Sequence, residues 1–334
     1  MLELTVTHTP IREWGAAAPL VPHQLWKEGH DSDSAGVVSF TWPGVGKDQI
    51  DLTLKVARNP QMNEGIQREK DMLNYLHGHL GQDPTYNQQF AHVYGSRSLG
   101  HSRGLLLTPI PGRAMSDSLH WWNRAYYLNL SGQWLGKFHN RTLTSWIVLD
   151  NQCLDWLITT YLDKLWGQQH PVPALLPLPE QLNGVKKGVW CTLHPLLGQK
   201  IPLTVVHGAF QADNLKIARG RISGLCNWGD GHIGGLPWED FWHFPLTLFA
   251  NRSGSIAESW NTLMAHRPLI NDYWHVYSQT KVTSNLPGVP WQWLSWACLV
   301  KAIKQILPWR TNWEKYQYWL DMAWCAANKP YLPD

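Results

Sequence analysis

The separation of strand-forming from helix-forming segments is the feature that most constrains the fold of this chain. Two β-rich runs, VVSFTW (residues 37–42) and IDLTLKVA (residues 50–57), flank the turn PGVGKDQ and predict an antiparallel hairpin. From Ser116 onward, helical patterns dominate. A run of strands followed by a run of helices predicts an α+β protein in which the two kinds of element are segregated.

A helix and two further strands are predicted to complete the β-rich part. Residues 63–80 place apolar side chains at spacings that suit a helix with one buried face, namely Ile66, Leu73, Leu76 and Leu80. Two more strand-like runs follow, FAHVYGSR (residues 90–97) and GLLLTPI (residues 104–110). The proline- and glycine-broken stretch PIPGRAMSD then predicts a connector between two lobes.

The length of 334 residues is enough for two lobes. We therefore expect an N-terminal β-rich lobe over residues 1–110 and a C-terminal helical lobe over residues 111–334. Within the second lobe, residues 120–143 predict a long helix and the proline-rich residues 170–182 a surface connector. Residues 205–228 are typical of strand, loop, strand, turn and strand.

Composition narrows the class of protein. Hydrophobic residues make up 44% of the chain and charged residues 16%, which is typical of a globular protein. The net charge of +3 gives no reason to expect nucleic acid or an anionic membrane as partner. The five cysteines form no CxxC pair, which argues against a zinc site or a disulfide framework. With neither a signal-like start nor an apolar run of membrane-spanning length, we expect a soluble, cytoplasmic protein.

The chain contains 22 tryptophans, spread along its whole length. The simpler interpretation is that they fill the core as bulky side chains. The alternative is a groove lined with flat rings, which would suit an apolar or sugar-like ligand.

Lys55 lies inside the strand-like run LTLKVA. An ammonium group flanked by apolar residues is costly to bury without a partner. Glu69, in the middle of the helix that follows, is positioned to face back toward this strand, so a Lys55–Glu69 ion pair is predicted. The alternative is an edge strand whose lysine lies in water.

The segment VVHGAFQADNLKIARGRISGLCNWGD carries the polar groups of most interest. His207 ends a β-branched strand, and Gly208 allows a sharp turn after it. Asn214 and Asn227 flank a short predicted hairpin, so both amide oxygens could face one magnesium and phosphate site. The alternative is an ordinary hairpin with polar turn residues.

These segments resemble, in order, the aminoglycoside phosphotransferase and choline kinase-like family, which shares the bilobal fold of protein kinases. The family signature HGDxxxxN, followed by a hairpin and an Asp-Trp or Asp-Phe step, is matched here by HGAFQADN and NWGD. LKVA, QREKDMLNYL, LLLTPIPGR, WLGKFHN and GGLPWEDFWHF are similar to further family segments. The resemblance implies ATP and Mg²⁺ as cofactors, a phosphate-binding pair Lys55 and Glu69, a nucleotide cleft near residues 108–113, and a structural anchor at Asp240.

The sequence departs from the family pattern where the chemistry lies. Ala209 occupies the place of the catalytic aspartate, and a methyl group neither accepts a proton nor orients a hydroxyl. Asn227 occupies the place of the metal-binding aspartate and brings no negative charge, which should weaken Mg²⁺ binding. Asp230 is a candidate replacement metal ligand beside Asn214, and Asp213 is a candidate replacement base. In residues 28–36, EGHDSDSAG, two aspartates would repel phosphates.

Three functions follow as hypotheses. The leading one is a pseudoenzyme of this family that retains weak binding of a nucleotide or small hydroxylated ligand and acts by binding a partner, such as a protein. The alternative is an ATP-dependent phosphotransferase acting on a small-molecule hydroxyl, with Ala209, Asn227 or both as inactivating substitutions. The third is a purely structural partner protein without nucleotide affinity. The C-terminal lobe carries no dense acidic cluster of the kind that would bind a polycationic aminoglycoside.

Overall fold

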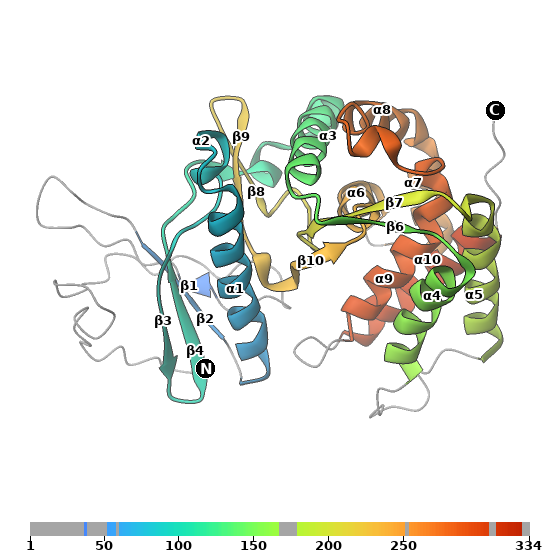
Figure 1. The fold of residues 1–334 in the computed structure, drawn as a ribbon, viewed down its shortest axis with the longest axis horizontal. Helices are drawn as coiled ribbons and strands as arrows, with labels where there is room; N and C mark the ends of the chain where they lie inside the picture. The colour runs from blue at the N-terminus through green and yellow to red at the C-terminus, as the bar shows by residue number, and fades with distance from the viewer. Residues whose placement is uncertain are drawn as a thin grey trace, which may run out of the picture. The chain divides into compact units, whose positions relative to one another are not determined.

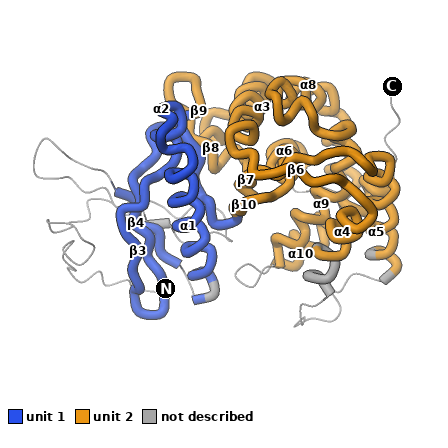
Figure 2. Tube along the Cα trace, in the orientation of Figure 1, with its two compact units in different colours: residues 1–112, 223–230 blue, residues 113–222, 231–334 orange. Residues whose placement is uncertain are grey.

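The computed structural model describes residues 37–38, 52–57, 60–166, 179–250, 254–306 and 312–328, as Figure 1 shows. The chain forms two compact units (Figure 2). The first comprises residues 1–112 and 223–230, and the second comprises residues 113–222 and 231–334. Residues 223–230, which a division at residue 110 assigns to the C-terminal lobe, belong to the first unit.

A four-stranded antiparallel sheet forms the first unit, in the order β1-β2-β4-β3. Its strands are β1 (Val37–Val38), β2 (Thr53–Val56), β3 (Val93–Leu99) and β4 (Ser102–Leu107). The predicted antiparallel pairing of the first two strands is confirmed, with Val37 opposite Lys55. β2 is therefore an interior strand, which excludes the alternative of an edge strand for Lys55.

The helix predicted over residues 63–80 is α1 (Asn63–Leu80). All four apolar side chains that predicted its buried face are buried, namely Ile66, Leu73, Leu76 and Leu80. The short helix α2 (Pro84–Asn87) follows, with Asp83 accepting a hydrogen bond from the backbone of Thr85 as its cap.

Two small sheets belong mainly to the second unit. One has the antiparallel order β10-β7-β6, formed by β6 (Ser145–Val148), β7 (Lys200–Val206) and β10 (His232–Gly235). The other has the order β5-β8-β9, formed by β5 (Arg113–Ala114), β8 (Leu215–Ala218) and β9 (Arg221–Leu225). The predicted strand, loop, strand, turn and strand over residues 205–228 is confirmed by β7, β8 and β9.

The rest of the second unit is helical. Its helices are α3 (Arg124–Arg141), α4 (Asn151–Trp166), α5 (Pro179–Leu193), α6 (Trp238–Pro245), α7 (Ile256–Ala265), α8 (Arg267–Tyr277), α9 (Leu294–Lys304) and α10 (Trp313–Asn328). A π-helical turn (Leu246–Ala250) follows Pro245, whose ring removes a backbone donor. The first unit combines a four-stranded sheet with α1 and α2, and the second is mainly helical with two small sheets, so the predicted α+β class is confirmed.

Tryptophans fill much of the helical core. Trp238 stacks on Trp274 and Trp293 with ring centroids 4.9 and 5.5 Å apart. Six are fully buried: Trp228, Trp238, Trp242, Trp293, Trp296 and Trp319. Core filling is thus confirmed for these six, whereas Trp121, Trp122, Trp146 and Trp156 are exposed.

Some sequence predictions fall outside the described residues. They concern EGHDSDSAG, most of VVSFTW, the turn after it and most of the proline-rich stretch of residues 170–182. Among the helices that the structure describes, none combines the length and apolar character needed to span a bilayer.

Candidate functional site

In the first unit, the predicted Lys55–Glu69 ion pair is confirmed. Lys55 Nζ lies 2.5 Å from Glu69 Oε1, and both side chains are more than 90% buried. The Lys55 ammonium also donates a hydrogen bond to Asn227 Oδ1 at 2.7 Å. Two oxygen acceptors thus compensate the burial of the Lys55 charge.

Asn227 reaches Lys55 because of an unusual backbone conformation. Its φ of 66° lies in the left-handed region, where asparagine is better tolerated than most other residues. The next residue, Trp228, donates its backbone N–H to Glu69 Oε1 at 3.3 Å and packs its buried ring edge-on against Phe90. The turn after β9 is therefore attached to α1 through Glu69 and to β2 through Lys55.

The family resemblance implies a Mg²⁺ site, but the two asparagines predicted as its ligands do not suit this ion. Asn227 directs its amide oxygen at an ammonium group 2.7 Å away, where a divalent cation would meet a second positive charge. Asn214 offers another neutral amide, whereas Mg²⁺ favours carboxylate and phosphate oxygens. Among the described residues, no group of three or more histidines, cysteines or acids could hold a metal ion. Metal ligation by Asp230 stays a prediction.

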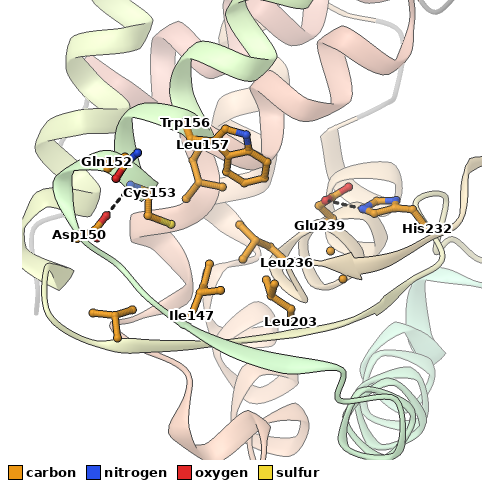
Figure 3. A pocket seen from close by; sticks show the side chains of 13 residues that line it. Ile147, Asp150, Gln152, Cys153, Trp156, Leu157, Leu203, His232, Leu236 and Glu239 are labelled. Carbon is orange, nitrogen blue, oxygen red and sulfur yellow. Dashed lines mark hydrogen bonds and ion pairs between the residues drawn. The ribbon is translucent and has the colours of Figure 1, made fainter.

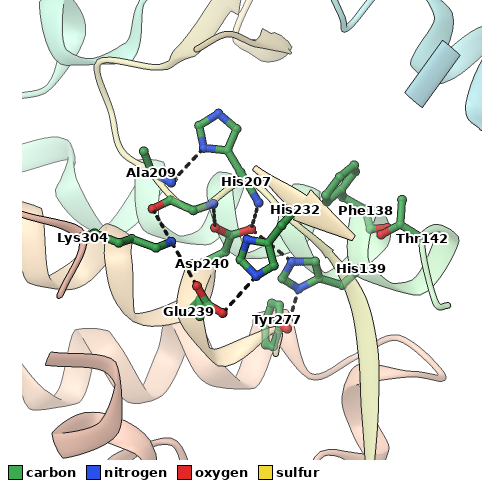
Figure 4. Close-up of polar contacts among 11 residues, drawn as sticks. Phe138, His139, Thr142, His207, Ala209, His232, Glu239, Asp240, Tyr277 and Lys304 are labelled. Carbon is green, nitrogen blue, oxygen red and sulfur yellow. Dashed lines mark hydrogen bonds and ion pairs between the residues drawn. The ribbon is translucent and has the colours of Figure 1, made fainter. Parts of the chain in front are cut away.

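In the second unit, the loop after β7 is anchored by a buried carboxylate. Asp240, on α6, is fully buried and accepts backbone hydrogen bonds from His207 at 2.7 Å and from Gly208 at 2.8 Å. Gly208 has a φ of 78°, a conformation that favours glycine. The anchoring role predicted for Asp240 is therefore confirmed (Figure 4).

Two more side chains hold Asp240 in place. His139 Nε2 lies 3.4 Å from Asp240 Oδ2, while His139 Nδ1 lies 2.8 Å from the hydroxyl oxygen of Tyr277. Burial alone would raise the pKa of Asp240, but the hydrogen bonds and charges of His139 and His207 lower it below its usual value. Asp240 therefore serves as the hydrogen-bond acceptor that anchors this loop.

Ala209 lies at the position that the resemblance assigns to the catalytic base. Its backbone N–H donates to His207 Nδ1 at 3.2 Å, and its carbonyl accepts from Asn214 Nδ2 at 2.8 Å. His207 and Asn214 therefore shape this loop through its backbone. A catalytic role for His207 and a metal-binding role for Asn214 stay predictions. The loop keeps its hydrogen-bond framework while its central side chain is a methyl group. A base role for Asp213, in the turn before Asn214, stays a prediction.

Sequence reasoning missed a chain of charges beside this loop. Lys304 Nζ, on α9, donates to the carbonyl of Gly208 at 3.1 Å and to Glu239 Oε2 at 3.0 Å. His232 Nε2 lies 3.2 Å from the other oxygen, Glu239 Oε1. The available signal was the pair Lys301 and Lys304 in the otherwise apolar helix LSWACLVKAIK, because buried lysines need partners.

The ionisation of Glu239 makes the free energy of unfolding depend on pH in the acid range. Burial alone would raise the pKa of Glu239, but Lys304 and His232 lower it from 4.5 to about 2. Because the folded-state value is depressed, this contribution is fully present above pH 4.5 and is lost as the pH falls toward 2. We expect Glu239→Gln to reduce the free energy of unfolding at pH 6 by about 3 kcal/mol.

Urea unfolding at pH 6, 4 and 3 measures this effect. The difference between the unmodified chain and Glu239→Gln should shrink at each step toward acid. The exposed Glu180→Gln is the matched control and should change stability by less than about 0.5 kcal/mol. A Glu239→Gln effect that is constant across this range would show that the ionised carboxylate is not the cause.

Comparison with known proteins identifies the family and the fold of the chain. The profile of the phosphotransferase enzyme family matches residues 35–267, which is more than half of the chain. The chain therefore belongs to the phosphotransferase enzyme family, and it has the kinase-like α+β bilobal fold of the solved structures that it resembles. The chain matches no curated protein sequence.

Three solved structures illustrate the shared fold. Aminoglycoside phosphotransferase APH(4)-Ia is 10% identical, with 96% of this chain and 97% of that chain covered and a TM-score of 0.58. A thermostable form of that protein with an aspartate replaced by alanine, in a ternary complex with ADP and hygromycin B, is 11% identical, covers 95% and 96%, and has a TM-score of 0.55. Aminoglycoside-3'-phosphotransferase of type VIII is 17% identical, covers 82% and 90%, and has a TM-score of 0.50. Identities this low establish the fold alone.

Proposed function

We propose that this protein is a pseudoenzyme of the phosphotransferase family, which binds a nucleotide or small ligand without transferring phosphate. The observation that carries the proposal is the loop around Ala209. Asp240, His207 and Asn214 hold its backbone, yet its central side chain is a methyl group. Because the loop retains its backbone hydrogen bonds but has no general base, we expect the site to bind a ligand without turning it over.

The nucleotide side of the proposal rests on Lys55. Lys55 and Glu69 form a buried pair on an interior strand, the arrangement that positions a phosphate-binding lysine in kinase-like proteins. ATP, when bound, would supply a transferable phosphoryl group, and Lys55 would hold its phosphates. A structurally similar phosphotransferase is known in complex with ADP and hygromycin B. Binding in the present chain should be weak, since Asn227 brings no charge to fix a metal.

The alternative is an active ATP-dependent phosphotransferase for a small hydroxylated molecule. The intact Lys55–Glu69 pair favours it, because kinase-like active sites require this pair to be in place, and the anchor at Asp240 keeps the loop around Ala209 ordered. It requires a base other than Ala209, for which Asp213 is the candidate within the loop. A purely structural role would instead predict no nucleotide affinity.

Titration calorimetry with ATP, in the presence and absence of Mg²⁺, tests the proposal. We expect weak binding whose affinity changes little with Mg²⁺, because Asn227 faces Lys55 and supplies no carboxylate. Lys55→Met should abolish the binding, and Lys70→Met, one residue beyond Glu69 on the same helix, is the matched control that should keep it.

Tight and strongly Mg²⁺-dependent binding would contradict this expectation and identify Asp230 as a working metal ligand. No binding at all, with both variants folded, would favour the structural role.

A further inference from the structure

The second unit contains a cavity whose lining includes no residue of the loop around Ala209. We call it the α4 cavity, because α4 forms one wall while the sheet β10-β7-β6 and the start of α6 form the others (Figure 3). Its volume is about 530 Å³, within the range of sites that hold small organic ligands. All of its lining residues belong to the second unit.

The middle of the α4 cavity is apolar. Ile147, Leu203, Leu157 and Leu236 contribute aliphatic side chains, and Trp156 contributes an indole ring (Figure 3). The Trp156 side chain is 56% exposed, although tryptophan is among the most costly side chains to leave in water. A ligand with a flat apolar face would cover this exposed ring and the aliphatic side chains beside it.

One side of the α4 cavity carries a single, balanced charge cluster. Glu239 pairs with His232 at 3.2 Å and with Lys304 at 3.0 Å, so its negative charge is already neutralised. The register of β10 against β7 shifts between His232 and Gly235, and an added Cβ at Gly235 would collide with His232 Nε2. Gly235 therefore leaves the room that His232 needs beside Glu239.

The opposite side offers hydrogen-bonding groups without an acidic cluster. Asp150 accepts the backbone N–H of Cys153 at 2.6 Å, and Gln152 lies beside them. Figure 3 shows Asp150 far across the cavity from Glu239. Because the two acids are separated and one is neutralised, the α4 cavity suits a neutral or singly charged ligand better than a polycation.

We propose that the α4 cavity binds a mostly apolar, ring-containing small molecule that carries one hydroxyl or amine group, directed toward His232 and Glu239. This inference rests on the proposed function, since it names the class of small ligand that the pseudoenzyme binds. Glu239 also joins the cavity to the loop, because Lys304 bridges Glu239 and the Gly208 carbonyl that precedes Ala209. A ligand bound to Glu239 would therefore contact the same carboxylate that binds Lys304, which in turn contacts this loop.

Titration with three probes, each in the absence of nucleotide, tests the proposal. The probes are 2-(2-naphthyl)ethanol, 2-(2-naphthyl)ethylamine and spermine, which are neutral, singly charged and polycationic. Both naphthyl compounds should bind the full chain, and spermine should neither bind more tightly nor displace them. Binding is measured by calorimetry, because 22 tryptophans would obscure a fluorescence change at one of them.

Two variants change the cavity in opposite ways. Trp156→Ala removes the ring, and Val148→Trp fills the space from a position that is 49% exposed. Each should weaken naphthyl binding by about tenfold or more. Trp146→Ala, an exposed tryptophan on β6 that does not line the cavity, is the matched control and should change affinity less than about twofold.

Circular dichroism confirms that each variant is folded before titration. Naphthyl binding that is unaffected by both Trp156→Ala and Val148→Trp would overturn the proposal, as would tighter binding of spermine or no naphthyl binding to the unmodified chain. Because these titrations contain no nucleotide, their failure contradicts the α4 cavity assignment alone. A failure to bind ATP contradicts the proposed function instead.

Discussion

Replacing Ala209 and Asn227 together by aspartate is expected to raise ATP turnover by about 10² to 10⁴ over the unmodified chain, the range that a general base contributes. The framework that would orient a carboxylate at residue 209 already exists, because His207 and Asn214 hydrogen-bond the backbone on either side of the Ala209 methyl. A carboxylate at residue 227 would add the charge that Mg²⁺ needs to neutralise the transferring group. Hydrolysis of ATP to phosphate is the measurement, because it requires no knowledge of the acceptor.

The single variants decide whether both sites are needed. Ala209→Asp alone should remain close to background, because the metal position still lacks its charge, and Asn227→Asp alone should remain there because the base is missing. Gln211→Asp adds an acid elsewhere in the same loop and is the matched control. Equal turnover in Gln211→Asp would show that position does not matter. No turnover in the double variant would contradict this prediction and favour a long-established binding role.

The second large effect is expected on stability, from Asp240→Ala. This change leaves the backbone N–H groups of His207 and Gly208, and the ring of His139, without the carboxylate that they share. Removing one partner from a buried, hydrogen-bonded charge typically costs about 3 to 5 kcal/mol. We expect a loss of this size in the free energy of unfolding, measured with urea at pH 7.

Asp272→Ala is the matched control, because Asp272 is an exposed acid on α8. It should change stability by less than about 0.5 kcal/mol. A loss below about 1 kcal/mol in Asp240→Ala would mean that the loop around Ala209 does not depend on this anchor.

Much of the first unit could be predicted from local sequence patterns. The spacing of Ile66, Leu73, Leu76 and Leu80 predicted the helix α1. All four side chains are buried in the structure, because this face of the helix packs on the sheet. The Lys55–Glu69 pair followed from the cost of burying an unpaired ammonium. The hydrogen bond from Lys55 to Asn227 was not predicted, because it joins residues 172 positions apart through a left-handed turn.

The loop around Ala209 was predicted in its motif but not in its surroundings. The resemblance identified His207, Asn214 and the anchor Asp240, whose roles depend on a short motif and one later segment. Lys304 was missed, since no local pattern shows that α9 returns its lysine to the Gly208 carbonyl. Long-range polar contacts of this kind are set by tertiary packing, which periodicity does not encode.

The tryptophans show the same limit. Their number predicted either core filling or a ring-lined groove, and the structure uses different tryptophans in different ways. Trp238 is buried in a stack, whereas Trp156 lines the α4 cavity and stays exposed. Composition alone does not distinguish these two environments, because the difference lies in which face of its helix each tryptophan occupies.

The most direct test of the central claim is ATP turnover by the unmodified chain, measured with Mg²⁺ in water and with a panel of sugars and nucleosides as acceptors. Lys55→Met supplies the background. We predict that phosphate release and product formation by the unmodified chain do not exceed this background, because Ala209 provides no base. Robust turnover above it would contradict the pseudoenzyme assignment and leave Asp213, or a group on the substrate itself, as the base.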